Sequence, residues 1–189
     1  MFNLDDVTLR PLETSDIESL YAWDGDIEVS VLGGWVRQQS RAAVARVWER
    51  RITEPAADMD WFGIEYEGKL AGYIQLALID PVERRAMVGI AVGAKSLWGK
   101  GIGGGALRLL CDYAFTVRNL DRVYAEVFTF NTRSMRLFEG VGFQHEGTLR
   151  QHEYHDGARQ DMHVYGLLRE EFYAHHPTIF KLPEKLPDA

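Results

Sequence analysis

The chain has 189 residues, of which 46% are hydrophobic and 12% aromatic, so it can bury a core and is expected to form one domain. Its net charge of -7 argues against nucleic-acid binding, which normally needs a basic face, and mildly favours cationic partners. A single cysteine excludes an internal disulfide, and no N-terminal apolar run resembles a signal peptide or membrane span. A cytoplasmic protein without membrane contact is therefore expected.

The front of the chain predicts one strand and two helices around an irregular segment. Residues 7–12 form a short strand that ends at a proline. Ser15 and Glu18 have the spacing of a capping box and begin a helix that runs to about Asp24. Residues 25–39 are predicted to be irregular, and Ser40 caps a second helix that reaches about Thr53.

The remaining elements alternate between strands and helices. They are an antiparallel hairpin of strands 60–66 and 70–79, a strand over 86–92, a helix over 103–117, a strand over 122–128, a helix over 132–140, and a hairpin of strands 148–154 and 161–168 around Asp156-Gly157. This order predicts a mixed α/β sheet rather than a doubly wound one. Residues 1–176 form the domain, and 177–189, with three prolines, are expected to be an extended or disordered tail.

A glycine-rich run, Trp98-Gly-Lys-Gly-Ile-Gly-Gly-Gly105, leads directly into the helix over 103–117. The first N–H groups of a helix have no intrahelical partner and carry partial positive charge, so this run is predicted to bind a phosphate group. A P-loop is disfavoured because Lys100 is followed by Gly101 instead of Ser or Thr. A Rossmann fingerprint is disfavoured because Asp121 precedes its strand.

With the segment from Asn131 to Phe143, this order of elements resembles the GNAT superfamily of N-acetyltransferases over nearly the whole chain. The matches at 9–12, 146–147, 156–161 and 165–168 look most like the RimJ/RimL branch, which acetylates protein N-termini; polyamine acetyltransferases are close by. The resemblance implies a single-domain GNAT fold, with a mixed, mostly antiparallel central sheet flanked by helices. It also implies acetyl transfer from acetyl-CoA, used as a co-substrate, to a primary amine.

The resemblance also assigns the acetyl-CoA site. The pyrophosphate is expected at the backbone amides of the loop, and the pantetheine arm is expected to lie like an added strand against the third strand of the sheet, where an amide stabilises the oxyanion. Asn131 is expected to contact pantetheine or to cap its helix. Trp98 stands where the family usually has Gln or Arg. The expected cofactor-binding residues are Ile90, Ala91, Val92, Trp98, Gly99, Lys100, Gly101, Ile102, Gly103, Gly104 and Asn131.

Catalysis is expected to depart from the commonest pattern of the family, because Phe138 stands where a proton-donating tyrosine is usual. The RimL-like pattern places a serine and a glutamate acting through water instead, and here these are Ser134 as acid and Glu153 as base. Ser134 could equally bond the local backbone, and Glu153 could simply face water. Tyr154 and Tyr165 are the alternative donors.

No metal site is expected. His152 and His155 are three apart on a strand, so they face opposite sides, and no Cys or His spacing completes a zinc set. Cys111 shares an apolar helix face with Leu107 and Leu110 and is predicted to be a core residue, not a nucleophile.

The acceptor is predicted to be a protein N-terminus or a small cationic amine of the polyamine or aminoglycoside-like kind. The run Asp24, Asp26 and Glu28 could attract it, although a solvated loop is the favoured interpretation; Trp35 either lines the acceptor pocket or packs in the core. A catalytically silent acyl-CoA-binding or sensing domain is the alternative suggested by Phe138. The oligomeric state stays open, with a homodimer among the alternatives.

Overall fold

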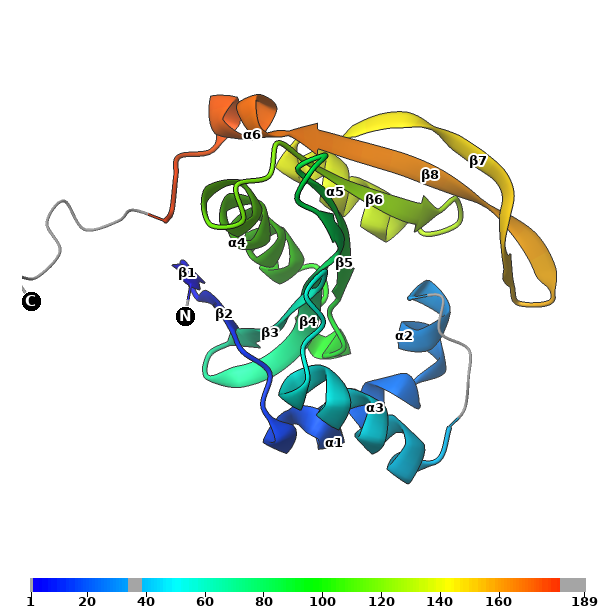
Figure 1. Cartoon of the computed structure of the whole chain (residues 1–189). Helices are drawn as coiled ribbons and strands as arrows, with labels where there is room; N and C mark the ends of the chain where they lie inside the picture. Colours follow the sequence, from blue (N-terminus) through cyan, green and yellow to red (C-terminus); the bar gives the residue numbers. More distant parts are fainter. Residues whose placement is uncertain (1, 34–38, 181–189) are drawn as a thin grey trace, which may run out of the picture.

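The computed structural model describes residues 2–33 and 39–180 and contains one eight-stranded sheet, with the strands in the order β1-β2-β3-β4-β5-β6-β8-β7 (Figure 1). Every neighbouring pair is antiparallel except β5 and β6, which are parallel. The strands are β1 (Phe2–Leu4), β2 (Val7–Arg10), β3 (Asp60–Tyr66), β4 (Lys69–Asp80), β5 (Arg85–Ala91), β6 (Arg122–Phe128), β7 (Gln144–His155) and β8 (Ala158–Leu168). The predicted mixed, mostly antiparallel sheet is confirmed.

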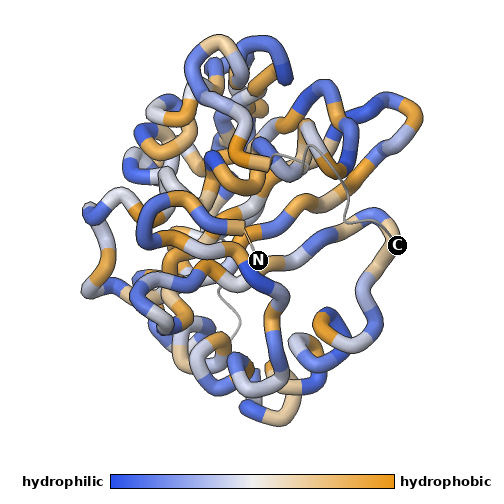
Figure 2. Tube along the Cα trace, turned by 90° about the vertical axis from the view of Figure 1, so that its left-hand side faces the viewer, coloured by the Kyte–Doolittle hydropathy of each residue, from blue (hydrophilic) through white to orange (hydrophobic). Residues whose placement is uncertain are grey.

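Helices cover both faces of this sheet. They are α1 (Ile17–Asp24), α2 (Ile27–Leu32), α3 (Arg41–Thr53), α4 (Ile102–Thr116), α5 (Thr132–Val141) and α6 (Arg169–His175), with short 3-10 turns at Thr14–Asp16 and Lys95–Leu97. Because side chains alternate along β4, Ile74 lies in the main core with α4, whereas Tyr73 packs with Trp48 of α3 in a second core. Hydrophobic residues run through the central strands, and many outer turns are hydrophilic (Figure 2).

The parallel pair opens part-way along its length. Only Arg85–Met87 of β5 pair with Arg122–Tyr124 of β6. Beyond them, residues 88–91 and 125–128 have no partner across this gap, and the two strands diverge (Figure 1). The sheet therefore has an opening at its centre, flanked by the start of α4 and the start of α5.

Three elements were not predicted, and one capping box was assigned to the wrong residues. β1 and α6 were missed. α2 lies in the segment that was expected to be irregular; a helix of six residues was missed there because it carries little periodic signal. Asp26 caps α2 by accepting hydrogen bonds from the N–H groups of Glu28 (3.0 Å) and Val29 (3.3 Å). The capping box is formed by Glu13 and Asp16 instead of Ser15 and Glu18, because Arg10 pairs with Asp16 at 2.8 Å and holds that turn.

The end of the described chain is bonded to α4. The buried carboxylate of Asp112 accepts hydrogen bonds from the N–H groups of Ile179 (2.9 Å) and Phe180 (2.7 Å) and from the Tyr173 hydroxyl (2.8 Å). Residues 177–180 form neither helix nor strand, and the rest of the predicted tail lies outside the described residues. Nearby, Cys111 is fully buried as predicted, and burial raises the pKa of its thiol. In the ranges that the structure describes, no helix is long and apolar enough to cross a bilayer.

Candidate active site

Two adjoining cavities occupy the opening of the sheet. The first cavity, of about 300 Å³, lies between β5, the start of α4 and the start of α5; the second, of about 320 Å³, lies over β4, β5, β6 and β7. They share a wall, since both are lined by Leu32, Gly33, Ile90, Ala91, Asn131 and Ser134.

The first cavity contains the amino end of α4. Gly101, the N-cap, has φ +82° and Gly99 has φ +79°, a backbone conformation that glycine adopts readily. The N–H groups of Ile102, Gly103 and Gly104 begin the helix and donate to no acceptor among the residues the structure describes. Both flanking glycines and these three residues line the cavity. The predicted anion cradle is therefore present as geometry.

One residue of the predicted loop site lies elsewhere. Lys100 does not line the cavity, and its N–H lies 3.4 Å from the carbonyl oxygen of Leu97. Positive charge comes instead from Arg133 and Arg136 of α5, which the sequence reasoning missed. Their three-residue spacing in the first turns of the predicted helix was the available signal.

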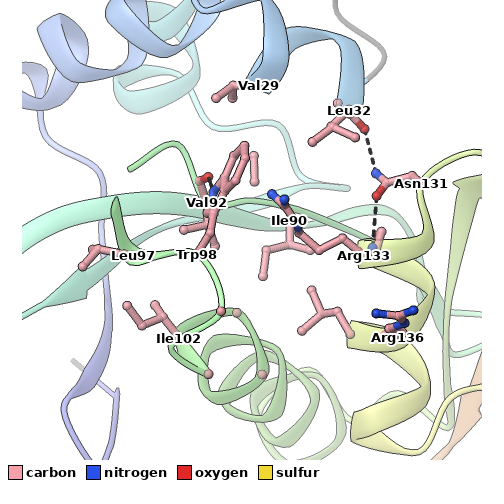
Figure 3. A pocket seen from close by; sticks show the side chains of 18 residues that line it. Val29, Leu32, Ile90, Val92, Leu97, Trp98, Ile102, Asn131, Arg133 and Arg136 are labelled. Atoms are coloured by element: carbon pink, nitrogen blue, oxygen red, sulfur yellow. Dashed lines mark hydrogen bonds between the residues drawn. The ribbon is translucent and has the colours of Figure 1, made fainter. Parts of the chain in front are cut away.

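Trp98 has a structural role that its position in the loop did not reveal. Its indole Nε1 donates a hydrogen bond of 2.6 Å to the carbonyl oxygen of Val92, just after β5 (Figure 3). The guanidinium of Arg133 lies 3.9 Å from the centroid of the indole ring, a distance suited to a cation–π contact. Trp98 therefore ties the loop to β5 and holds a cation beside the first cavity.

The edge of β5 that faces the opening can accept an extended ligand. Ile90, Ala91 and Val92 line the first cavity, and β5 has no partner on this side after Met87. Alternate backbone groups of an unpaired strand edge are free to hydrogen-bond, so a ligand can pair there like a strand.

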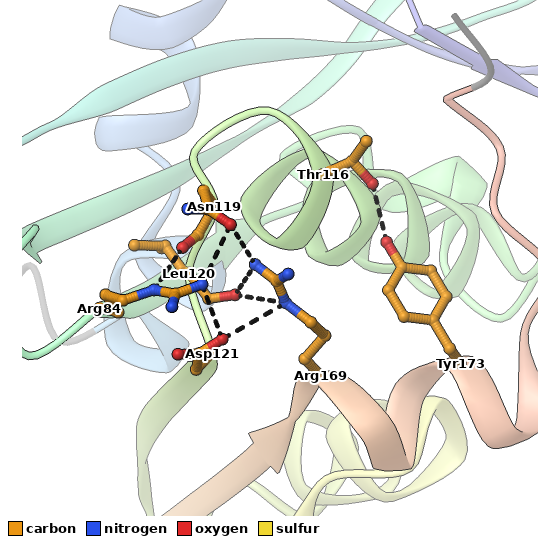
Figure 4. A network of polar contacts seen from close by, with 7 residues as sticks. All are labelled: Arg84, Thr116, Asn119, Leu120, Asp121, Arg169 and Tyr173. Carbon is orange, nitrogen blue, oxygen red and sulfur yellow. Dashed lines mark hydrogen bonds and ion pairs between the residues drawn. The ribbon is translucent and has the colours of Figure 1, made fainter.

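A network of hydrogen bonds and ion pairs joins the segments just before β5 and β6 to the start of α6 (Figure 4). Arg169, at the start of α6, donates to the carbonyl oxygen of Leu120 (2.9 Å from Nε) and to the Asn119 side chain (3.0 Å). Arg84, just before β5, donates to the same Asn119 oxygen (3.0 Å) and pairs with Asp121 (3.0 Å). The Arg84–Asp121 pair thus joins the residues just before β5 and β6, at the end where the two strands pair.

The start of α5 supplies the shared wall. The Asn131 side chain caps the helix by accepting the N–H of Ser134 (3.0 Å) and donates to the carbonyl oxygen of Leu32 in α2 (3.1 Å; Figure 3). The capping role considered for Asn131 is therefore observed. The hydroxyl of Ser134 makes no hydrogen bond within residues 2–33 and 39–180 and lines both cavities.

The aromatic residues considered as proton donors lie apart from the shared wall. Phe138 is buried and lines the second cavity, but it has no proton to donate. The Tyr165 hydroxyl donates to Glu139 (3.0 Å), Tyr154 is 68% exposed, and neither tyrosine lines a cavity. Tyr73, which was not considered, lines the second cavity, and burial raises its pKa.

A bulge in β7 positions Glu153. Leu149 pairs with Met162 and Glu153 with Gln160, so residues 150–152 lie opposite Asp161 alone. Gln151 adopts φ +51°, and its N–H donates to Asp161 Oδ1 at 2.7 Å. With this change of register, Glu153 lines the second cavity. Its side chain is 53% exposed, so water can reach the carboxylate.

Glu126 of β6 also lines the second cavity, and the sequence reasoning missed it. His152 Nε2 lies 3.7 Å from Glu126 Oε2 and 4.0 Å from Glu153 Oε1, so one imidazole neighbours both carboxylates. A lone glutamate in a largely apolar predicted strand was the available signal.

The two cavities differ in charge. Among the described lining residues, the first has two arginines and no carboxylate, whereas the second has Glu126 and Glu153 and no Lys, Arg or His. The first cavity thus suits an anion and the second suits a cation.

The remaining predicted candidates lie away from the cavities. Asp26 and Glu28 both pair with Lys95, at 2.6 and 3.5 Å, and Asp24 does not line a cavity either. Trp35 falls outside the described residues. His155 stacks on Phe128, and the described ranges hold no group of three or more His, Cys, Asp or Glu side chains placed to bind a metal.

Comparison with known proteins agrees with this arrangement. The family model of the acetyltransferase (GNAT) domain matches residues 6–144. The chain is 32% identical to a putative ribosomal N-acetyltransferase of Bacillus subtilis, with 88% of this chain and 93% of that protein covered. It is 29% identical to the spermidine N(1)-acetyltransferase of Escherichia coli, with 91% of both covered.

The fold is shared with solved structures. Spermidine N-acetyltransferase from Vibrio cholerae, in complex with CoA and spermine, matches with a TM-score of 0.81 and 24% identity over 90% of this chain and 99% of that one. The chain belongs to the GNAT family and is an acetyl-CoA-dependent N-acetyltransferase.

Proposed function

We propose that this enzyme transfers an acetyl group directly from acetyl-CoA, bound in the first cavity, to a cationic primary amine that enters the second cavity. The opposite charges of the two cavities carry this proposal. A small polyamine and a protein N-terminus both provide such an amine, and spermidine acetyltransferases and a putative ribosomal N-acetyltransferase are among the relatives.

The first cavity fits acetyl-CoA. The N–H groups of Ile102, Gly103 and Gly104 would bind the pyrophosphate with Arg133 and Arg136 beside it, and the free edge of β5 would bind the pantetheine arm. Asn131 and Ser134 lie where this cavity meets the second one. When bound, acetyl-CoA supplies the thioester whose carbonyl carbon is attacked.

Two side chains provide acid–base chemistry in this proposal. The acceptor must lose a proton to become nucleophilic, and Glu153, reached through water, takes that proton as the N–C bond forms. The Ser134 hydroxyl donates to the sulfur as the C–S bond breaks, and solvent restores its proton. A backbone N–H of Ile90–Val92 stabilises the charge that develops on the carbonyl oxygen. An α-amino group, with a pKa of about 7.7 to 8.0, needs less help than a lysine-like amine near 10.4.

Glu153→Gln tests the base. We expect kcat to fall about 100-fold, the typical size of a general-base contribution, with the Kd for CoA unchanged. Glu170→Gln, an exposed carboxylate on α6 away from both cavities, is the matched control. A Glu153→Gln enzyme with the kcat of the wild type would remove Glu153 as the base.

Ser134→Ala tests the donor. We expect a fall in kcat of about tenfold, the loss of one hydrogen bond to a charged sulfur, without a change in the Kd for CoA. An unchanged kcat would move the donor role to another group, such as Tyr73, which also lines the second cavity.

The identity of the acceptor is the untested part of this proposal. Thiol release from saturating acetyl-CoA, measured with N-terminal peptides, polyamines and aminoglycosides, tests it. CoA binding with no turnover on any of these amines would overturn transfer to a cationic primary amine.

A further inference from the structure

One residue that lines the second cavity has a hydrogen-bond acceptor without a partner. Gln75, on β4, lines the cavity, and its Oε1 atom is buried without a hydrogen-bond partner among the described residues. Buried amide oxygens in proteins are nearly always hydrogen-bonded, so an orphan acceptor that lines a cavity indicates a donor on the ligand.

The neighbouring strand is shaped to hold this side chain. Gly89 of β5 pairs with Gln75 in the sheet, and a Cβ on Gly89 would lie 2.7 Å from Gln75 Nε2 and 3.2 Å from its Cγ. The absence of a side chain at residue 89 therefore lets the Gln75 side chain lie over β5, in the cavity between β4 and β6.

Glu126 of β6 supplies negative charge to the same cavity. Its side chain is only 29% exposed, and in the described part of the chain it has no Lys or Arg partner. By contrast, Glu65 on β3 pairs with Arg10, and Glu146 on β7 pairs with Arg122. Beside Glu126 is the imidazole of His152, whose Nε2 lies 3.7 Å from Glu126 Oε2. A half-buried carboxylate that has an imidazole neighbour but no lysine or arginine partner favours a positively charged ligand.

We infer that Gln75 and Glu126 form a subsite for a second ammonium group of the acceptor, and so select diamines and polyamines over monoamines. This inference rests on the proposed function, in which Glu153 serves the amine that reacts. The reacting amine has to lose its proton, whereas a group that stays protonated gains most from a permanent carboxylate and a carbonyl oxygen. Neither Gln75 nor Glu126 is required for the chemical step.

The test compares binding of matched acceptors to the CoA-loaded protein by calorimetry. The probes are straight-chain α,ω-diamines of three to eight carbons and the monoamines of the same lengths, which differ by one ammonium group. We expect the wild type to bind the best diamine at least tenfold more tightly than its monoamine. Glu126→Gln should remove about tenfold of diamine affinity, the loss of one charge-assisted hydrogen bond, and leave monoamine affinity unchanged.

Two further variants sharpen the result. Gln75→Met keeps the length of the side chain without its oxygen and should weaken diamine binding, whereas Gln75→Glu adds a charge and should strengthen it. Glu170→Gln is the control for net charge, and the Kd for CoA reports whether each variant is folded. Equal effects of Glu126→Gln on diamines and monoamines, or none on either, would overturn the subsite.

Failure of the subsite differs from failure of the proposed function. If Glu126→Gln selectively weakens diamine binding but the wild type releases no thiol with any amine, the subsite stands and the proposed reaction falls. If thiol is released with amines but the preference for diamines is independent of Glu126 and Gln75, the reaction stands and the subsite falls.

Discussion

Gly104→Ala should raise the thermal stability of the protein and weaken its binding of CoA. Gly104 is the third residue of α4, and a Cβ added there meets no atom within 4 Å. The substitution therefore adds no clash, and the gain in helix propensity is worth up to about 1 kcal/mol. For a chain of this size, that corresponds to a rise in Tm of about 2–4 °C.

Binding of CoA should change in the opposite direction. Gly104 lines the first cavity, so the new methyl group takes space beside the free N–H groups of the cradle. Loss of one hydrogen bond to a charged phosphate costs about 1.5–3 kcal/mol, which is roughly a 10- to 100-fold rise in Kd. Calorimetric titration with CoA and thermal denaturation of the same preparation measure both effects.

Gly140→Ala is the matched control. Gly140 lies in α5, also has open space around an added Cβ, and lines neither cavity. It should raise Tm similarly and leave CoA binding unchanged. If Gly104→Ala raised Tm and bound CoA as tightly as the wild type, the placement of the pyrophosphate at the start of α4 would be refuted.

Three carboxylates give further predictions. Asp161→Ala removes the oxygen that accepts the Gln151 N–H, so the bulge should relax and kcat should fall about tenfold. Asp161→Asn keeps an acceptor oxygen and should retain most of the activity. Equal kinetics for the wild type and both variants would contradict this role of the bulge. Asp112→Ala leaves buried donors unpaired and should lower the free energy of unfolding by about 2–4 kcal/mol in urea titrations, and a loss under about 1 kcal/mol would argue against the bonded C-terminal segment. Burial alone would raise the pKa of Asp16, but hydrogen bonds from Arg10 and a backbone N–H outweigh burial and hold this pKa below 3.8. The stability advantage of the wild type over Asp16→Asn should therefore be full at pH 7 and decline as the pH falls through the folded pKa; an equal advantage at pH 7 and pH 2 would exclude the ion pair as its source.

Local signals in the sequence were sufficient for most of the fold. The bounds of β3 and β6 were predicted to the residue, because each is a run of strand-forming residues between turn residues. The cradle could be predicted for a similar reason: the N–H groups at a helix start belong to the residues that form it, whatever packs around them.

The elements and boundaries that were not predicted depend on contacts between segments far apart in the sequence. α2 is too short to show a period and is held by Asn131, 99 positions after Leu32. β7 was expected to begin at Thr148 but begins at Gln144, where its pairing with β8 sets the boundary. Strand ends are determined by partners as much as by the strand itself.

The set of residues that line the second cavity was decided by the tertiary structure. The sequence alone predicted an anion site at the start of α4 and showed that Phe138 has no proton to donate. Only the folded sheet placed Glu153 in the second cavity, because a bulge changes the register of β7 there. The folded sheet also brought Gln75 of β4 and Glu126 of β6 into the same cavity. Which side chains point to the same face of the sheet depends on the register of strand pairing, and the divergence of β5 from β6 opens the space between them.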